Sequence, residues 1–387
     1  MWSRALHWYA CPICHGALRL EILDERRVDL APEYLTIAKE LGLLEADINR
    51  FIESAVLLCA NCRALYPVVQ GLPVLIPYTT PTHTEFEAAH KASLAAFPEY
   101  GWPATVAVPG EEYVMRSFAA EWKDYDYDGV IWDLSYEDHE KRFLAEIGDQ
   151  ILRDGRGGIF VEVGCGLGLT TLFASKNLRC DAIGVDLSLA VLRATSQFKE
   201  NPFLHFVQGS AFYLPLRPSI ATVLYSHGVL HHTYSTQRAV TAVSEQCGRN
   251  GWIYLWLYGS GSKQGSVARR IAFALEETVR PVIARHLSAL PVRAALSSMA
   301  CAYLAVNAFH RLHDPSVGKY TFANAVHAAR DRFTPLFAHR HDFPEVAGWL
   351  RQLGFERLEK VDWQTMPTAN QANYRRNTGV RGRRVLT

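Results

Sequence analysis

The sequence Ile159-Phe-Val-Glu-Val-Gly-Cys-Gly-Leu-Gly-Leu-Thr-Thr-Leu-Phe173 decides the fold of this chain. It begins with an apolar, β-branched run, which predicts a buried parallel strand over 159–163. Three closely spaced glycines follow: Gly164, Gly166 and Gly168. Glycine allows positive φ angles and leaves backbone N–H groups open to a ligand at the start of a helix. Because helical spacing begins at Leu169, the stretch predicts a strand, a ligand-binding turn and a helix.

A second short strand ends in a carboxylate. Residues 181–186 read Asp-Ala-Ile-Gly-Val-Asp, and Asp186 lies 18 residues after Gly168. This separation is close to the ~20 residues at which a nucleotide-binding βαβ unit places the acid that binds ribose. The glycines are spaced Gly-x-Gly-x-Gly, with Glu162 just before them. Dinucleotide dehydrogenases instead use Gly-x-Gly-x-x-Gly, so the pattern differs from theirs.

The glycine turn and Asp186 resemble motif I and the next acidic strand end of the class I S-adenosylmethionine-dependent methyltransferases. Four further stretches resemble later motifs of the family in the same order: 184–188, 206–216, 225–233 and 248–258. The resemblance implies an α/β fold, namely a Rossmann-like seven-stranded sheet with helices on both faces, and S-adenosylmethionine as cofactor. The chain also alternates predicted strands (159–163, 181–186, 203–208, 220–226, 252–258) with predicted helices (169–177, 188–199, 235–247).

The length of 387 residues indicates more than one domain. Residues 1–80 are expected to form a zinc ribbon with a helical insertion over about 24–55, and residues 81–150 a linker and helical cap. Residues 151–260 and 340–387 are expected to form the methyltransferase-like domain, which a helix ending at Gly354 and two antiparallel strands, 355–363 and 378–386, would close. Residues 261–339 are expected to form a helical insertion that covers the acceptor site.

Two Cys-x-x-Cys pairs lie in the first part of the chain: Cys11 with Cys14, and Cys59 with Cys62. Four thiolates complete one tetrahedral zinc site of the structural kind, with no open position for catalysis. The intervening sequence predicts a helical pair over 32–53, and a hairpin turning at Gln70-Gly71 follows the second pair. Together these features resemble the small zinc ribbon of methyltransferase activator subunits and of bacterial ribosomal-RNA guanine methyltransferases. The alternative is four reduced cysteines that hold no metal.

The methyltransferase resemblance also implies which residues bind the cofactor. The backbone of the glycine turn would lie against its ribose and amino-acid portion, and Glu162 would act through water or the amino group. Asp186 would accept both ribose hydroxyls, and Leu187 would cover the adenine. Serine at 210 is a departure, because the family often has Asp-Ala there beside the adenine amino group. The cofactor-binding candidates are Glu162, Gly164, Cys165, Gly166, Gly168, Asp186, Leu187, Ser210 and Ala211.

Methyl transfer is an in-line displacement, and orientation alone supplies about 7–11 kcal/mol of the barrier reduction. A base is needed only when the acceptor must lose a proton of high pKa. Three histidines beyond the strand at 220–226 are candidates for this base: His227, His231 and His232. The alternative is that they form a structural turn without a role as base. His339, Arg340 and His341 are a second candidate group on the acceptor side.

Aromatic residues are concentrated before the glycine turn: Phe118, Trp122, Tyr125, Tyr127 and Trp132. Rings in a cap over the cofactor would attract its sulfonium by about 0.5–2 kcal/mol each. An ordinary aromatic satellite core explains the same residues equally well. Ser135 and Asp138 predict a capping box for the helix that follows.

Composition limits the partners that we expect. The chain is 49% hydrophobic and 20% charged with a formal net charge of +1, so nucleic acid is not an expected partner. The first residues lack the apolar core of a secretory signal, and eight cysteines favour a cytoplasmic location. The apolar run 290–309 is expected to be a buried or homodimer-forming helix and not a membrane span. Five arginines are attributed to a solvated strand edge and not to RNA binding: those at 375, 376, 381, 383 and 384.

The sequence therefore predicts methyl transfer from S-adenosylmethionine to a small-molecule acceptor: a secondary metabolite, a sugar or a lipid-like intermediate. An RNA methyltransferase that grips ribosomal or transfer RNA with the zinc ribbon is the first alternative. A protein that binds S-adenosylmethionine without methylating, such as a scaffold or a cyclase, is the second. The acceptor atom stays open at this point.

Overall fold

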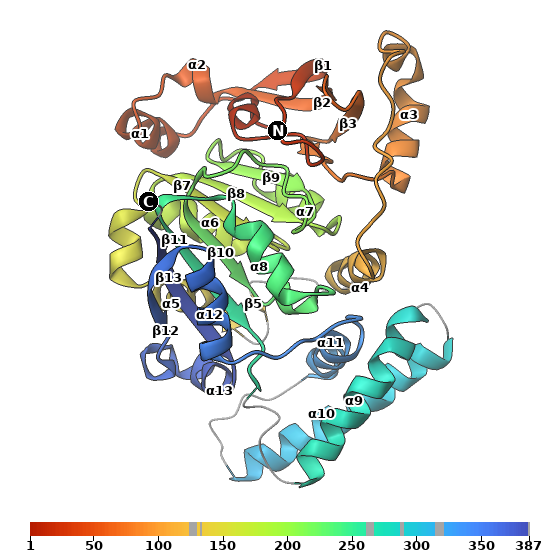
Figure 1. Cartoon of the computed structure of the whole chain (residues 1–387), viewed down its shortest axis with the longest axis vertical. Helices are drawn as coiled ribbons and strands as arrows, with labels where there is room; N and C mark the ends of the chain where they lie inside the picture. Colours follow the sequence, from red (N-terminus) through yellow and green to blue (C-terminus); the bar gives the residue numbers. More distant parts are fainter. Residues whose placement is uncertain (124–129, 132–133, 261–266, 287–289, 314–320, 386–387) are drawn as a thin grey trace.

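The structure, a computed structural model, describes residues 1–123, 130–131, 134–260, 267–286, 290–313 and 321–385. A small antiparallel sheet at the N-terminus lies on a larger central sheet, and a group of helices lies at the opposite end of the molecule (Figure 1). A two-stranded hairpin of β5 (Val130–Ile131) and β6 (Leu134–Ser135) precedes the central sheet in the chain.

The central sheet has seven strands in the order β12-β13-β11-β10-β7-β8-β9 within the described residues. In that order the strands span Phe355–Lys360, Thr378–Arg384, Cys247–Leu257, Ala221–His227, Ile159–Val163, Asp181–Asp186 and Leu204–Gln208. Strands β11, β10, β7, β8 and β9 pair in parallel, whereas β13 is antiparallel to both β11 and β12. The predicted Rossmann-like sheet and its antiparallel closing pair are confirmed.

Helices cover both faces of this sheet, because neighbouring residues of a strand point to opposite sides. Phe160 packs with one hydrophobic cluster, which contains residues of α5 (Tyr136–Asp154), α6 (Leu169–Leu178) and α7 (Ala190–Gln197). Val161 packs with a second cluster, which contains residues of α8 (Thr236–Ser244) and α12 (Phe343–Gln352). The continuous apolar run in β7 therefore reflects burial on both faces.

The arginines of the last strand do not lie on the solvated sheet edge that the sequence analysis expected. Strand β13 lies between β11 and β12, so its arginines are not on a solvated sheet edge. Arg383 donates to the carbonyl of Asn250, and Arg384 donates to the carbonyls of Ser244 and Cys247. Arg384 therefore pairs with partly buried carbonyl groups at the end of the sheet, and Arg383 with an exposed one. A helix that the sequence did not predict, α13 (Thr368–Arg376), connects β12 to β13 after the short turn η4 (Trp363–Thr365).

The N-terminal sheet has the order β1-β2-β3-β4, with strands Arg19–Arg27, Arg50–Cys59, Ala64–Val69 and Leu72–Pro73. The short helix η1 (Ser3–His7) precedes it, and α1 (Pro32–Glu40) and α2 (Glu45–Ile48) lie between β1 and β2. The helical pair predicted over 32–53 is thus too long, because residues from Arg50 onward pair with β1 and Phe51 packs on Trp2. The hairpin turns at Gln70-Gly71 as predicted, with φ of 50° and 80°.

The small sheet and the central sheet share one hydrophobic core. Tyr9 and Leu75 are fully buried in the same cluster as Val163 and Val185 of the central sheet. Just beyond β4, Val74 forms a parallel bridge with Gln208, the last residue of β9. The N-terminal unit therefore covers the free edge of β9, next to the carboxyl ends of the parallel strands.

The remaining helices lie around the end of the central sheet at which β7, β8 and β10 finish. They are α4 (Glu111–Lys123), α9 (Val267–Arg285), α10 (Leu290–His313) and α11 (Phe322–Phe333). Helix α3 (Pro81–Leu94) instead packs on β3 of the N-terminal sheet (Figure 1). Helix α10 packs along α11 but exposes Val306, Phe309 and Leu312, so this face is not buried within the chain. The dimer-forming alternative stays a prediction. None of the helices in the described ranges is long and apolar enough to cross a membrane. The capping box of Ser135 and Asp138 is present at the start of α5.

Candidate functional site

The glycine turn after β7 is held against the neighbouring strand. The N–H groups of Gly164 and Cys165 donate to the carbonyl of Val185 at 2.7 and 3.1 Å. Gly164 has a φ of 82°, and a Cβ atom there would lie 2.1 Å from Cγ2 of Val229. Gly168 has a φ of 77°, and its Cβ would lie 2.6 Å from the ring of Phe206. Both positions therefore require glycine, for conformation and for space.

Asp186 lies at the carboxyl end of β8, directly beside this turn. Its Oδ2 atom accepts a hydrogen bond from the N–H of Gly166 at 2.8 Å. Its Oδ1 atom accepts from the N–H and the hydroxyl of Ser188 at 2.8 and 2.7 Å. Burial raises the pKa of Asp186, and these donors oppose that rise. The carboxylate is thus oriented before any ligand binds.

Glu162 lies beneath the turn on the side of α6. It is buried, and the hydroxyl of Thr171 donates to its Oε2 atom at 2.5 Å. Burial raises the pKa of Glu162 to about 8, although the hydrogen bond from Thr171 lowers it. Thr171 was not among the residues selected from the sequence. Its position in the first turn of α6 lets it orient Glu162 toward the glycine turn.

Ser210 lies just beyond β9 and is fully buried. Its hydroxyl donates to the carboxylate of Glu111, the first residue of α4, and accepts from the N–H of Phe212 at 3.1 Å. Ala211 packs at the margin of the core that β7 and β8 share. Leu187 packs against Val74, Ile76 and Tyr78, the segment that leaves the N-terminal sheet. Sequence reasoning missed Glu111, because it lies 99 residues before Ser210 in an apparent linker.

His227, the last residue of β10, has a charged partner. Its Nδ1 atom lies 2.7 Å from Oε1 of Glu146, and its ring stacks on Trp256 with the centroids 4.5 Å apart. Burial raises the pKa of Glu146, but His227 and Arg142 outweigh burial and lower it to about 2. Burial also lowers the pKa of His227 itself, and Arg142 adds to this effect, whereas Glu146 opposes it. The side chain of His227 is 18% exposed.

The other two histidines are more enclosed. His231 is fully buried, and neither ring nitrogen has a hydrogen-bond partner among the described residues. His232 is also buried, and its Nδ1 atom bonds to the carbonyl of Phe337 at 2.8 Å. Burial lowers the pKa of His232 to about 4. Of the three candidates, His227 is therefore partly exposed, whereas His231 and His232 are buried. These two buried residues form the histidine wall.

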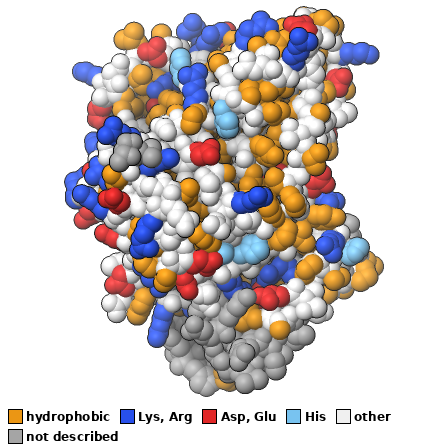
Figure 2. Space-filling view, in the orientation of Figure 1, with side chains coloured by type: hydrophobic (Ala, Val, Ile, Leu, Met, Phe, Trp, Pro, Cys, Tyr) orange, Lys and Arg blue, Asp and Glu red, His pale blue; other side chains and the backbone are white. Residues whose placement is uncertain are grey.

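Residues between α11 and α12, and one residue of α4, lie close to the histidine wall. The N–H of His339 donates to the carbonyl of His231, and the guanidinium of Arg340 lies 5.4 Å from the ring centroid of Tyr258. His341 pairs with Glu345 on α12 instead. Phe118 of α4 meets the ring of His232 edge-on at 5.6 Å. On the face of the molecule drawn in Figure 2, histidine side chains lie beside basic ones in the lower half.

The other aromatic residues predicted to cap the cofactor cannot be placed in the same way. Tyr125, Tyr127 and Trp132 lie outside the described residues, as does the side chain of Trp122. Of that group, Phe118 alone is described with its side chain, and it belongs to the wall beside His232. The cap therefore stays a prediction.

The sequence from 161 to 255 matches the family described as "Methyltransferase domain". These residues run from β7 into β11 and include the glycine turn, Asp186 and the three histidines. The chain has a class I S-adenosylmethionine-dependent methyltransferase domain. No curated protein matches the sequence of this chain.

Several solved structures align with the methyltransferase. The YcgJ protein of Bacillus subtilis is 14% identical, with 62% of this chain and 99% of that chain covered and a TM-score of 0.35. A complex of the Haloferax volcanii Trm112 methyltransferase activator with a putative methyltransferase aligns at 12% identity, 70% and 98% coverage and a TM-score of 0.40. Magnesium protoporphyrin IX methyltransferase of Synechocystis aligns at 12% identity, 71% and 97% coverage and a TM-score of 0.39. Scores this low carry no argument about the activity.

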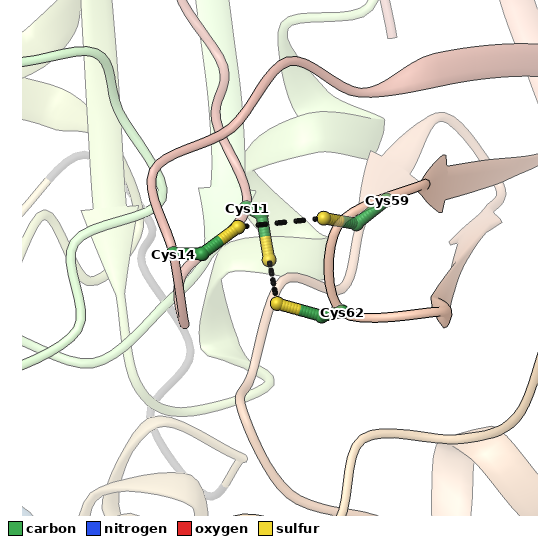
Figure 3. Close-up of side chains that lie close together, drawn as sticks. All are labelled: Cys11, Cys14, Cys59 and Cys62. Carbon is green, nitrogen blue, oxygen red and sulfur yellow. Dashed lines mark hydrogen bonds between the residues drawn. The ribbon is translucent and has the colours of Figure 1, made fainter.

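The four cysteines of the methyltransferase's N-terminal sheet converge (Figure 3). All four Sγ atoms lie within 4.8 Å of one another, with Cys11 and Cys62 separated by 3.9 Å and Cys14 and Cys59 by 3.5 Å. A tetrahedral zinc with Zn–S bonds of about 2.3 Å separates its sulfur atoms by about 3.8 Å. The N–H of Gly16 donates to Sγ of Cys14 at 3.4 Å, as expected beside a thiolate. The donor set and its spacing fit zinc.

Glu146 is a further residue that the sequence analysis missed. It is fully buried on α5 and accepts hydrogen bonds from the hydroxyls of Tyr225, Tyr254 and Tyr374 as well as pairing with His227. One signal was present: Phe143, Ile147 and Ile151 form the apolar stripe of α5, and Glu146 lies next to that stripe. A carboxylate on the buried face of an amphipathic helix indicates a buried partner.

Proposed function

We propose that this methyltransferase transfers the methyl group of S-adenosylmethionine to a small-molecule acceptor that must lose a proton, with His227 as general base. The pair of His227 and Glu146 carries this proposal. Glu146 is ionised and can only accept hydrogen bonds, so Nδ1 of His227 donates the proton between them. Nε2 then keeps its lone pair and is the atom that takes the proton of the acceptor.

The register of the sheet supports this role for His227. Tyr225 in β10 lies opposite Glu162 in β7, and the two strands run in parallel. Continuing this register by two residues brings His227 level with Gly164, the first residue of the glycine turn. The hydroxyl of Ser226 bonds to the carbonyl of Val163 at 2.9 Å and holds the two strand ends together. The proposed base therefore lies beside the turn proposed to hold the methyl donor.

The residues around the turn fit a sulfonium nucleoside. When bound, S-adenosylmethionine supplies a methyl group that is already activated for in-line displacement. Asp186 would accept the ribose hydroxyls, and the backbone from Gly164 to Gly168, including Cys165, would lie along the ribose and amino-acid portion. Glu162 would face the amino group. Leu187, Ser210 and Ala211 would border the adenine, since they follow the ends of β8 and β9.

Contacts made by α4 and by the segment after α11 favour a small acceptor over RNA. The hydroxyl of Ser117 on α4 donates to that of Thr334 after α11 at 2.8 Å, and both residues are buried. Phe337 and His339 bond to the histidine wall from the same side. These contacts lie near the end of β10, where an acceptor would bind, and they support an enclosed acceptor side. An enclosed acceptor side suits a metabolite better than a folded RNA, and the formal charge of +1 agrees.

Incubation of the protein with methyl-labelled S-adenosylmethionine and cell extract tests this function. Mass spectrometry should show a small molecule that gains one labelled methyl group, together with S-adenosylhomocysteine. His227→Gln should lower the rate of this labelling about 10²–10⁴-fold and leave binding of S-adenosylhomocysteine unchanged. His286→Gln, at an exposed histidine after α9, is the matched control. Label found only in RNA, or methylthioadenosine as the product, would overturn the proposal.

We also propose that Cys11, Cys14, Cys59 and Cys62 hold a structural zinc ion. The separations of the sulfur atoms support it, and four thiolates leave no site for substrate. Elemental analysis of the purified protein should give about one zinc per chain. Cobalt substitution should add the thiolate charge-transfer absorption of a tetrahedral site. Protein that retains four titratable thiols and no metal after refolding with zinc contradicts this assignment.

A further inference from the structure

A buried carboxylate oxygen without a donor lies where the proposed function puts the adenine. Glu111 is 6% exposed, and its Oε1 atom accepts from the hydroxyl of Ser210. Its Oε2 atom has no hydrogen-bond partner among the described residues. Leaving a buried acceptor unpaired costs free energy, so such an atom in a native fold calls for an explanation.

The strand order sets the direction in which the base extends. Strand β8 lies between β7 and β9, with the glycine turn after β7 and Asp186 at the end of β8. A nucleoside whose sugar bonds to Asp186, and whose amino-acid portion lies on the turn, must extend its base toward the end of β9. Ser210 and Glu111 lie at that end.

The surroundings of Glu111 suit the flat face and polar edge of a purine. Leu187 packs with Val74, Ile76 and Tyr78, which supply apolar surface from the segment that leaves the zinc ribbon. The hydroxyl of Tyr78 is buried and lies near the carboxylate of Glu111, but it makes no hydrogen bond with good geometry among the described residues. Apolar walls with one acceptor at the edge are what an aromatic ring with an exocyclic amino group requires.

We infer that Glu111 accepts a hydrogen bond from the exocyclic amino group of the cofactor's adenine. Ser210 has no carboxylate, so Glu111 supplies one at this position. Glu111 belongs to α4, a helix outside the nucleotide-binding core. Ser210 positions it through the hydroxyl contact to Oε1. Since burial raises the pKa of Glu111, a donor from the ligand would also stabilise its charged form. This inference rests on the cofactor placement in the proposed function.

Calorimetric titration with two nucleosides tests the inference. S-adenosylhomocysteine carries the amino group, whereas S-inosylhomocysteine carries a carbonyl oxygen in its place. The wild-type protein should bind the adenosine compound about 10- to 100-fold more tightly, because the carbonyl would face a carboxylate. Glu111→Gln should lose most of this preference, since an amide can donate to the carbonyl. Glu112→Gln, at the exposed next position, should keep it.

The outcomes separate the two proposals. A Glu111→Gln protein that weakens both nucleosides equally, or neither, assigns Glu111 a purely structural role and overturns the inference. Wild-type protein that binds neither nucleoside overturns the proposed function as well. Should the variant not fold, titration of wild-type protein with the N6,N6-dimethyl derivative of S-adenosylhomocysteine decides the matter. Equal affinity for the derivative, which has no donor, contradicts the inference.

Discussion

The Nδ1 atom of His227 lies 2.7 Å from Oε1 of Glu146, although 81 residues separate them in the chain. The pair joins the end of a central strand to the buried face of α5, and Trp256 stacks on the imidazole. This contact holds one ring nitrogen as a donor and leaves the other with a lone pair, as the proposed role of His227 as base requires.

Glu146→Gln should lower the rate of labelled methyl transfer by at least tenfold, because an amide does not hold the Nδ1 proton as a carboxylate does. Loss of the negative partner also disfavours imidazolium, so the pKa of His227 should fall further. Activity requires neutral His227, so the acidic limb of the rate–pH profile should move to lower pH while the plateau drops. Initial rates from pH 5 to 9 measure both effects. An unchanged plateau with an unmoved limb contradicts the role of Glu146.

Glu162 predicts a pH dependence of stability. Its pKa is raised from 4.5 in the unfolded chain to about 8 in the fold, chiefly by burial. The native state therefore retains a proton that the unfolded state loses, and the free energy of unfolding should fall as pH rises from 4.5 to 8. The slope from this group is at most about 1.4 kcal/mol per pH unit. The contribution is complete below pH 4.5 and lost above pH 8.

Glu162→Gln should remove this part of the slope and make the protein relatively more stable at pH 8. Urea denaturation at a series of pH values measures the difference from wild type. Glu85→Gln, at an exposed position of α3, is the control. A Glu162→Gln protein with the wild-type slope would show that the carboxyl group titrates normally in the fold.

The shared core predicts that the N-terminal sheet, with the zinc ion proposed for its four cysteines, stabilises the catalytic domain. Tyr9 and Leu75 pack with Val163 and Val185, so loss of the ribbon exposes the core beneath the glycine turn. Cys62→Ser should destabilise the whole protein by about 4 kcal/mol or more, or roughly 10 °C in melting temperature. It should also weaken binding of S-adenosylhomocysteine, since Val74 bridges to Gln208.

Cys301→Ser, at an exposed cysteine of α10, is the matched control and should melt like wild type. Calorimetry should show one transition for wild type, because the two units share their core. Two separate transitions of the wild-type protein, with cofactor affinity unchanged in Cys62→Ser, would indicate independent domains and contradict the prediction.

Alanine substitutions of Gly164 in the glycine turn and of Gly348 in α12 should have opposite effects on the stability of the fold. Gly164→Ala should destabilise the fold by about 2–4 kcal/mol, because φ is 82° and the new Cβ would meet Val229 at 2.1 Å. Gly348→Ala should instead stabilise it by about 0.5–1 kcal/mol, since Gly348 lies within α12 and its Cβ would meet nothing within 4 Å. Chemical denaturation of the two variants measures the difference. Equal effects would show that the turn relaxes freely.

Much of the fold could be predicted because its signals are local. The run 159–163, the glycine spacing and the carboxylate at Asp186 each depend on neighbouring residues, and the structure places strands and turn there. The error at Arg50–Glu53 has the opposite origin. That segment has helical spacing of apolar residues, but pairing with β1 and packing on Trp2 decide its conformation. The arginines of β13 were misassigned for the same reason, because strand order is a property of the whole sheet.

The sequence by itself determined the class of fold, the glycine turn and the set of four cysteines, since each is written as a short pattern of residue types. It left three histidines equivalent and gave no reason to select Glu111, and the one signal for Glu146 was its place beside the apolar stripe of α5. Only the tertiary structure decided these points, because a side chain's partner, burial and pKa depend on residues about a hundred positions away. His227 differs from His231 through Glu146, and Ser210 acquires its carboxylate from Glu111.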